Sequence, residues 1–342
     1  MSSVNIKDVA ALAGVSIGTV SNVLNRPERV SPESRERVHT AIEKLGYVRN
    51  DAARQLRAGH SRSIGMIVLD VGNPFFTDVA HGAETRASVD GYSLLLASSD
   101  EDTSREQVYL DLFQEQRVHG MLITPHGDVV SQLIALRRLG IPTVLVDRQT
   151  ENRTFSSVAM DDVAGGRLAA KHLIDVGRRR LAFVGGPRSL RQVADRLAGA
   201  RTVVHQASGV TLETLGTSAL TVDEGRAAAE TLLNRPESER PDAIFAANDL
   251  LAIGILQTLT MSGAVAIPND IALIGYDDIS FAASSAVPLS SVRQPTALIG
   301  ETAVDLLLRE AQAAGDENFE HEQIVFQPEL VVRASTSAGR AA

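Results

Sequence analysis

Residues 5–25 read NIKDVAALAGVSIGTVSNVLN, a stretch that predicts two short helices joined by a tight turn. The first helix repeats apolar residues at the spacing of one buried face, and Gly14 ends it. Ser16 is suited to cap the second helix. A third helix is predicted from Ser31-Pro32 to Leu45-Gly46. Three short helices of this size predict a helix-turn-helix bundle, whose second helix enters the major groove of DNA.

The charge of the 342-residue chain is divided unevenly between this head and the rest. The formal net charge is −9, yet residues 1–62 carry ten basic and six acidic side chains. The remaining residues carry 23 basic and 36 acidic side chains. A basic head on an acidic body favours contact of the head alone with phosphates.

Composition also limits the class of protein. The chain has no cysteine, which excludes disulfides and thiolate metal sites, and we expect no cofactor or metal. The N-terminus lacks the apolar core of a signal peptide, and no run approaches the ~20 apolar residues of a membrane span. We therefore expect a cytoplasmic protein with no membrane partner.

From Ser63 onward, short apolar runs alternate with stretches of helical length such as 76–90, 104–116 and 129–139. Continuous apolar strands that alternate with helices predict parallel sheets covered on both faces. Because the pattern stops and starts again after residue 161, we expect two lobes. The runs are Ile64–Leu69, Tyr92–Leu96, Met121–Ile123 and Thr143–Val146, then Leu181–Val184, Ala243–Ala246 and Ile271–Ile274.

The predicted fold class is an all-α helix-turn-helix head followed by an α/β body of two lobes, each with a doubly wound parallel sheet. We expect a DNA-binding domain over 1–47, a hinge helix and linker over 48–62, and a disordered tail over 335–342. The N-terminal lobe is expected to hold 63–160 plus about 293–321, and the C-terminal lobe 161–292 plus about 322–334.

Polar and aromatic side chains follow the predicted strands. Ligands of such folds bind beyond the carboxyl ends of the strands, here in the cleft between the lobes. Aromatic faces can pack on the C–H faces of a sugar while planar polar groups bond its hydroxyls. The sequence therefore predicts a monosaccharide site and no catalytic residue. The candidates are Asn73, Phe75, Phe76, Asp147, Arg148, Arg196, Asn248, Tyr276, Asp277 and Gln294.

The head resembles the lactose-repressor (LacI) family of bacterial transcription regulators. The resemblance rests on Ile6-Lys7-Asp8-Val9-Ala10, Gly14-Val15-Ser16, Thr19-Val20-Ser21, Leu24-Asn25 and Ala52-Ala53-Arg54-Gln55-Leu56. It implies that Ile17, Gly18 and Asn22 read base edges, with Asn22 bonding adenine and Ile17 contacting a thymine methyl. Members of the family commonly have Arg at the position of Asn22, so their operators cannot be transferred to this chain. The expected phosphate contacts are Ser16, Thr19, Ser21 and Asn25.

Residues 50–59 predict a helix of two turns, which is marginal in water on its own. The resemblance implies that this hinge helix forms against that of a dimer mate in the minor groove. There Leu56 would wedge between base pairs, and Arg54 and Arg57 would meet phosphates or groove edges. Asn50 is suited to cap the helix.

The body resembles the type I periplasmic binding protein fold, and its pocket resembles that of ribose-binding members. The resemblance covers residues 5 to 333 and implies a dimeric repressor of sugar uptake or catabolism genes, which a ribose-like pentose releases from a pseudo-palindromic operator. A hexose, a polyol or a purine as effector, or an effector that acts as co-repressor, stays open. An enzyme that uses Asp147 and Asp277 is disfavoured because no nucleophile–base pair accompanies them. The DNA-reading head argues against an exported receptor.

Overall fold

The computed structural model describes residues 4–47, 61–127, 129–150, 153–313, 315–316 and 319–337. The chain divides into two compact units, Met1–Ser61 and Arg62–Ala342, each of which is described by itself. The predicted hinge contacts Asn50, Arg54, Leu56 and Arg57 lie outside the described residues.

The first unit is the helical bundle that residues 5–25 predict. Asn5 and Asp8 form a capping box at its start, and Gly14 ends the first helix with a left-handed φ of 63°. Ser16 caps the second helix by accepting from the Thr19 N–H at 3.0 Å. The elements are α1 (Ile6–Ala13), α2 (Ile17–Asn25), the 3-10 turn η1 (Pro27–Arg29) and α3 (Pro32–Leu45).

Small apolar side chains from all three helices fill the core of the bundle. The fully buried ones are Val9, Ala10, Ala13, Val20, Val23, Val38 and Ala41. Leu24, Ile42 and Leu45 are half-buried at the margin of this core. The head therefore has a core of its own, built from side chains between Ile6 and Tyr47.

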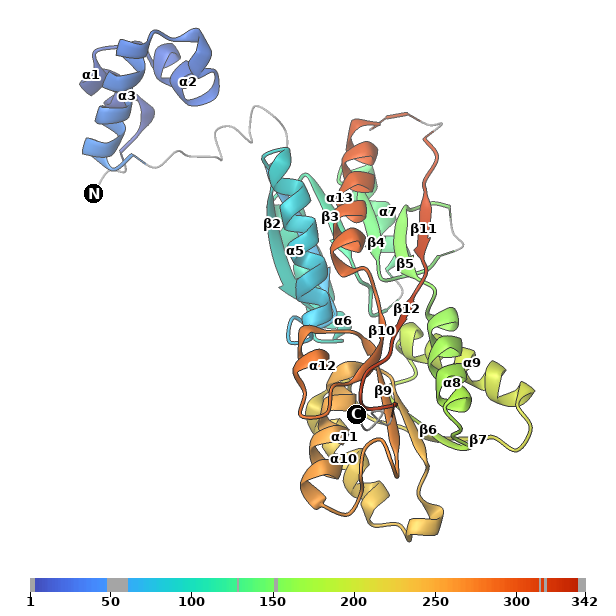
Figure 1. Cartoon of the computed structure of the whole chain (residues 1–342). Coiled ribbons are helices and arrows are strands. Elements are labelled where there is room, and N and C mark those ends of the chain that lie inside the picture. Colours follow the sequence, from blue (N-terminus) through green and yellow to red (C-terminus); the bar gives the residue numbers. More distant parts are fainter. Residues whose placement is uncertain are drawn as a thin grey trace. The chain divides into compact units, whose positions relative to one another are not determined.

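The second unit contains two six-stranded sheets, one in each lobe (Figure 1). All neighbouring strands are parallel except β10 and β12. In spatial order the first sheet holds β11 (Gln323–Phe326), β5 (Ser157–Met160), β4 (Thr143–Val146), β3 (Gly120–Ile123), β1 (Ser63–Val68) and β2 (Ser93–Ser98). The second holds β12 (Glu329–Val331), β10 (Ser290–Arg293), β9 (Ala272–Asp277), β8 (Ala243–Ala246), β6 (Arg180–Val184) and β7 (Thr211–Leu215).

Helices cover both faces of the first sheet. Met66 and Val68 of β1 point toward one cluster of apolar side chains and Ile67 toward another, as the two-residue period of a strand requires. The first cluster includes α5 (Pro74–Val89) and α13 (Thr296–Gln312), and the second includes α6 (Thr103–Glu115) and α7 (Val130–Arg138). This double cover explains why the strands read as continuous apolar runs.

Helices α5 and α13 approach so closely that their contact needs glycine. A Cβ atom at Gly82 would lie 2.3 Å from the Ala297 carbonyl oxygen, and one at Gly300 would lie 2.1 Å from that of Val79. Helix pairs also flank the second sheet. They are α8 (Asp162–Asp175) with α9 (Arg191–Gln206), and α10 (Val222–Leu233) with α11 (Asp249–Ser262), beside the short helix α12 (Ser280–Ser284) and the turn η2 (Glu237–Glu239).

The predicted return of the chain to the second lobe at about residue 322 was wrong. Strand β11 pairs with β5 in the first sheet, so the chain leaves that lobe only after Phe326. The strand contains only the short apolar run Ile324–Phe326, and all four of its residues are half-buried. Only its parallel pairing with β5 shows that β11 belongs to the first sheet.

The prediction of a disordered tail over 335–342 was also wrong at its start. Ser335 and Thr336 are buried, and residues 338–342 lie outside the described part. The Ser335 hydroxyl accepts from the Ser290 N–H at 2.8 Å and donates to the Leu273 carbonyl. The Thr336 hydroxyl lies 2.7 Å from both the Ser290 hydroxyl and His172 Nε2. These polar residues thus bond inside the second lobe and are not solvated.

Replacing Ser335 by Val should destabilise the second unit by about 1–3 kcal/mol, because it leaves the buried Ser290 N–H without an acceptor. Urea unfolding followed by circular dichroism measures the change. Ser337→Ala, at an exposed neighbouring position, is the control and should cost no more than about 0.5 kcal/mol. Equal losses in the two variants would contradict a structural role for Ser335.

Candidate functional site

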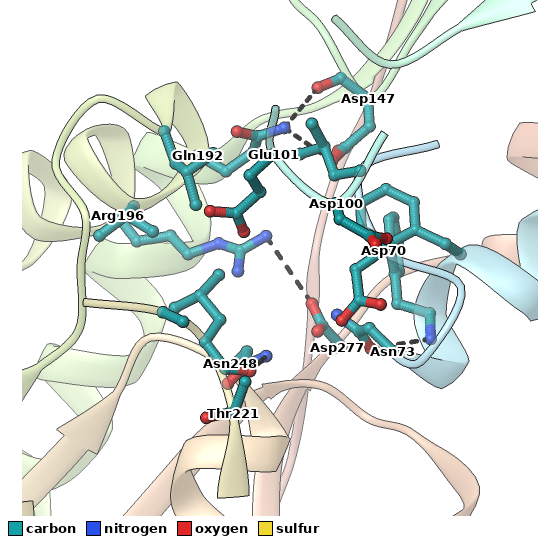
Figure 2. Close-up of a pocket in the computed structure, with 17 residues that line it drawn as sticks. Asp70, Asn73, Asp100, Glu101, Asp147, Gln192, Arg196, Thr221, Asn248 and Asp277 are labelled. Carbon is teal, nitrogen blue, oxygen red and sulfur yellow. Dashed lines mark hydrogen bonds and ion pairs between the residues drawn. The ribbon is translucent and has the colours of Figure 1, made fainter. Parts of the chain in front are cut away.

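A cavity of about 260 Å³ lies where the carboxyl ends of the strands from both lobes meet (Figure 2). Its walls come from the segments that follow β1, β2 and β4 of the first lobe and β6, β7, β8 and β9 of the second. This is the cleft that the strand-end rule predicts. Seven of the predicted effector residues line it: Asn73, Phe75, Phe76, Asp147, Arg196, Asn248 and Asp277.

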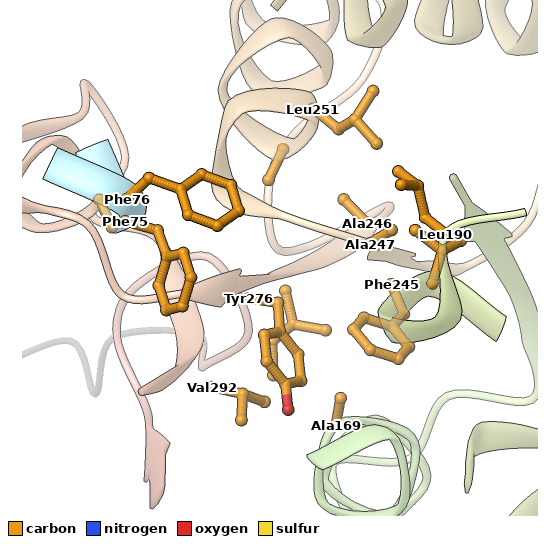
Figure 3. Close-up of a cluster of buried hydrophobic side chains, with 14 of the residues drawn as sticks. Phe75, Phe76, Ala169, Leu190, Phe245, Ala246, Ala247, Leu251, Tyr276 and Val292 are labelled. Carbon is orange, nitrogen blue, oxygen red and sulfur yellow. The ribbon is translucent and has the colours of Figure 1, made fainter. Parts of the chain in front are cut away.

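Three predicted residues do not line this cavity. Tyr276 is completely buried, and the Arg196 guanidinium lies 3.7 Å from the centre of its ring. Figure 3 shows the Tyr276 ring beside that of Phe245, with which it stacks. Gln294 is buried behind Asp277 and donates to its Oδ1 at 2.8 Å. Arg148 lines a small neighbouring cavity. Tyr276 and Gln294 therefore support lining residues, since their own polar atoms face the protein interior.

The segment Asn73-Pro74-Phe75-Phe76 supplies the apolar wall of the first lobe. Asn73 caps α5 by accepting from the Phe75 N–H at 3.0 Å, and Pro74 occupies the first turn, where no N–H is needed. The two phenyl rings meet edge to face, with centroids 4.9 Å apart. Helix capping thus positions both rings beside the cavity.

Arg196 is the cation of the cavity wall, and it is only 3% exposed. Its Nε donates to Asp162 Oδ1 at 2.8 Å and its Nη1 to the Ala247 carbonyl at 2.8 Å. Its Nη2 lies 3.7 Å from Asp277 Oδ1. The guanidinium is therefore compensated and fixed, with its edge turned toward the cavity as Figure 2 shows.

Asp147 joins the two lobes. Gln192 of α9 donates from Nε2 to both Asp147 Oδ2, at 2.8 Å, and the Asp147 carbonyl, at 2.9 Å. Asp147 Oδ1 is buried and has no hydrogen-bond partner among the described residues. A buried acceptor without a donor on the wall of a cavity is suited to a hydroxyl of a ligand.

The buried carboxylates of the cavity hold their protons more tightly than usual. Burial and the nearby Asp162 charge raise the pKa of Asp147 to about 8, although Arg196 opposes the shift. Burial raises the pKa of Asp277 to about 6, against the stabilising Arg196 charge and the Gln294 hydrogen bond. Both residues have positive φ, 54° and 102°, a strained backbone that is typical of functional sites.

Several wall residues were missed from the sequence: Asp70, Asp100, Glu101, Gln192 and Thr221. Asp100 and Glu101 follow β2 and have positive φ of 50° and 57°. Their position after a strand was the available signal, and Gln192 stands one helical turn before Arg196. Five acidic side chains and a single cation line the cavity, so it offers an anionic ligand little positive charge.

In the head, the outward side of α2 carries the predicted base-reading residues. Ile17 is 46% exposed, and Gly18 and Asn22 are also exposed. Among the predicted phosphate contacts, Ser16 and Asn25 are exposed, whereas Thr19 and Ser21 are half-buried. The Ser16 and Thr19 hydroxyls bond each other at 2.9 Å, and Asn25 donates to the Ser21 carbonyl at 2.7 Å. These local bonds order the side chains on that face of the helix.

Neither a metal-binding cluster nor a membrane-spanning helix is found in the described residues. No group of three or more His, Cys, Asp or Glu side chains there is arranged to hold a metal ion. None of the helices within these ranges is both long enough and apolar enough to cross a membrane.

Comparison with known proteins finds matches for both units. Residues 5–50 match the family described as "Bacterial regulatory proteins, lacI family", and residues 170–336 match "Periplasmic binding protein-like domain". The HTH-type transcriptional repressor PurR of Aliivibrio fischeri (strain MJ11) is 33% identical over 96% of this chain and 97% of its own. The ribose operon repressor of Bacillus subtilis (strain 168) is 35% identical over 89% of this chain and 90% of its own.

Solved structures show the same relationship. The lac repressor dimer bound to operator and the anti-inducer ONPF matches with a TM-score of 0.83 and 28% identity, over 98% of this chain and all of that one. A LacI family transcriptional regulator from Enterococcus faecium with bound ribose matches with a TM-score of 0.72 and 27% identity, over 80% of this chain and 98% of that one.

The free energy of unfolding of the second unit should fall as the pH rises from about 4 to about 8. Asp147 and Asp277 keep their protons to higher pH in the folded chain than in the unfolded chain, so their contribution is complete below the ordinary carboxyl pKa and is lost as the pH passes the folded values. Urea titrations across this range measure the slope. Asp147→Asn should flatten it, whereas the exposed control Asp111→Asn should not, and an unchanged slope in Asp147→Asn would contradict the assignment.

Proposed function

This chain belongs to the lacI family of bacterial regulatory proteins, and on that premise we propose that it represses genes for sugar uptake or catabolism and is released from its operator by a ribose-like monosaccharide. Its relatives in the comparisons are repressors, so its ligand cavity serves regulation and not catalysis. Its site of action is the cytoplasm, where operator DNA is accessible.

The observation that carries the effector proposal is the buried, unpartnered Asp147 Oδ1 in a cavity with phenylalanine walls. A sugar hydroxyl would donate to this oxygen, and the Phe75 and Phe76 rings would cover an apolar sugar face. Arg196 and Asn73 would bond further hydroxyls. Ribose is favoured because one relative is named a ribose operon repressor and the Enterococcus faecium structure holds ribose.

The proposed DNA contacts follow from the exposed side of α2. Asn22 presents an amide that can bond the N6 and N7 atoms of adenine, and Ile17 an alkyl group for a thymine methyl, beside Gly18. Ser16, Thr19, Ser21 and Asn25 would contact phosphates and set the register. We expect a homodimer that reads a pseudo-palindrome, since the matching lac repressor structure is a dimer bound to operator.

Coupling between sugar and DNA is proposed to pass through movement of the lobes. A sugar hydroxyl bound to Asp147 would change the hydrogen bond that Asp147 accepts from Gln192 across the cleft. This movement would in turn form or unfold the hinge helix. The hinge residues that would contact the minor groove are Asn50, Arg54, Leu56 and Arg57. The sugar changes operator affinity only if it binds one arrangement of the lobes more tightly than the other. The ratio of these two sugar affinities sets the largest possible change in operator affinity.

Asn22→Ala should reduce discrimination at one base pair of each half-site by about 1–3 kcal/mol, because it removes a bidentate amide–adenine contact. The operator is first selected from random DNA with the wild-type protein, and its single-base variants are then titrated at fixed salt. Asn25→Ala, a change at a proposed phosphate contact, should weaken all sequences alike. A uniform loss with Asn22→Ala would contradict base reading by this residue.

Ribose should raise the melting temperature of the protein and lower its affinity for the selected operator. Asn73→Ser keeps a side-chain oxygen to cap α5 but removes the amide, and should weaken ribose binding by about tenfold with little change in stability. A hexose, a polyol and a purine base are tested in parallel. A tighter complex with operator in the presence of ribose would make the sugar a co-repressor, and a response to another ligand alone would exclude ribose.

A further inference from the structure

A second cavity, of about 220 Å³, lies in the first lobe on the side where its strands begin. Its walls come from the end of α7, the loop before β4, the end of α13 and the segment that leads into β11. The effector cavity shares none of these residues. The second cavity is thus a separate hollow of the same lobe, near the amino ends of the strands.

A buried histidine–glutamate pair forms the floor of this cavity. His321 Nδ1 lies 2.8 Å from Glu310 Oε1, and the two side chains are only 6% and 4% exposed. The same Glu310 oxygen accepts from the Ser156 N–H at 3.3 Å, so the carboxylate is held in place. The Phe319 ring meets the imidazole edge to face at 5.2 Å. These contacts fix the orientation of the imidazole and leave Nε2 as the ring nitrogen that they do not use.

That second nitrogen, His321 Nε2, is buried and has no hydrogen-bond partner among the residues that the structure describes. Leaving a buried polar nitrogen unpaired costs about 1–3 kcal/mol, which a bound hydrogen-bonding partner would recover. With Nδ1 held against the Glu310 carboxylate, Nε2 is the ring nitrogen left to bond a ligand of the cavity.

Two arginines at the end of α7 provide the other donors of the cavity. Arg137 donates from Nη1 to the Thr154 carbonyl at 2.7 Å, which orients its guanidinium. Arg138 is exposed and makes no side-chain hydrogen bond within the described ranges. The acidic members are Glu310, which lies against His321 Nδ1 and accepts from the Ser156 N–H, and the exposed Asp316. This donor set contrasts with the five carboxylates of the effector cavity.

We propose that this second cavity binds a phosphoryl group, either as free phosphate or on a small metabolite, between Arg137, Arg138 and His321. A phosphoryl group offers several oxygens in three dimensions, which suits two guanidinium groups and one imidazole on the walls of a single cavity. A planar carboxylate would satisfy fewer of these donors at once. The site goes beyond the proposed sugar and operator contacts and does not depend on them.

The position of the cavity relates it to the effector site through one strand. Pro142 lines the cavity immediately before β4, and Asp147 follows the other end of β4 in the effector cavity. Helix α13 also ends at the second cavity, with Glu310 in its last turn. A phosphoryl group there would contact elements that carry the effector site.

The test is a calorimetric titration of the full chain with inorganic phosphate and, separately, with ribose 5-phosphate. We expect binding that Arg138→Ala weakens by about tenfold or more, because a charge-assisted hydrogen bond is lost. Arg201→Ala removes an exposed positive charge from α9 in the other lobe and should leave the affinity unchanged. Equal affinities for the two ligands would identify the phosphoryl group alone as the determinant, and tighter binding of the ester would indicate a metabolite.

A second readout reports on the imidazole itself. Phosphate should shift the Nε2 resonance of His321 in nitrogen NMR spectra, with the signal assigned by its absence in His321→Gln. The proposal is overturned if neither phosphate nor the ester binds, or if Arg138→Ala binds as the wild type does. It is also overturned if phosphate binds without moving the His321 resonance.

Discussion

The buried guanidinium of Arg196 is the interaction on which the arrangement of the ligand cavity depends. A charge removed from water must be compensated, and Asp162, Asp277, the Ala247 carbonyl and the Tyr276 ring together provide that compensation. These partners belong to α8, β9 and the segment after β8, so one side chain of α9 ties four elements together. The orientation of Asp277, and through it of Gln294 on the crossover toward the first lobe, follows from this network.

A second constraint is the accumulation of carboxylates at strand ends with left-handed backbone. Asp100, Glu101, Asp147 and Asp277 all have positive φ and all line the cavity. A non-glycine residue in this region is strained by about 1–3 kcal/mol, and the surrounding sheets must hold it there. This backbone conformation places the carboxyl groups at the cavity without a long loop.

Local chemistry explains which features could be predicted from the sequence. The caps Ser16 and Ser31 and the helix end at Gly14 depend on neighbours within four residues, so the head was predicted closely. The main cavity residues followed from the strand-end rule. Tyr276 was misplaced because side chains alternate between the two faces of a strand, and this alternation decides which of them reach the cavity. In a strand buried on both faces, every position is apolar or buried, so the sequence does not show which face a residue is on. Glu101 and the strand β11 were missed because loop conformation and long-range pairing determine their positions.

The late return of the chain has a consequence for the order in which the protein is made. The first sheet receives β11, and the second receives β12 and the hydrogen bonds of Ser335, only after all their other strands have been synthesised. The head needs nothing beyond residue 47 for its own core. Domains fold as they emerge from the ribosome, so the growing chain carries a finished DNA reader before either lobe can close. A chain interrupted late in translation would retain the reader without a complete sensor.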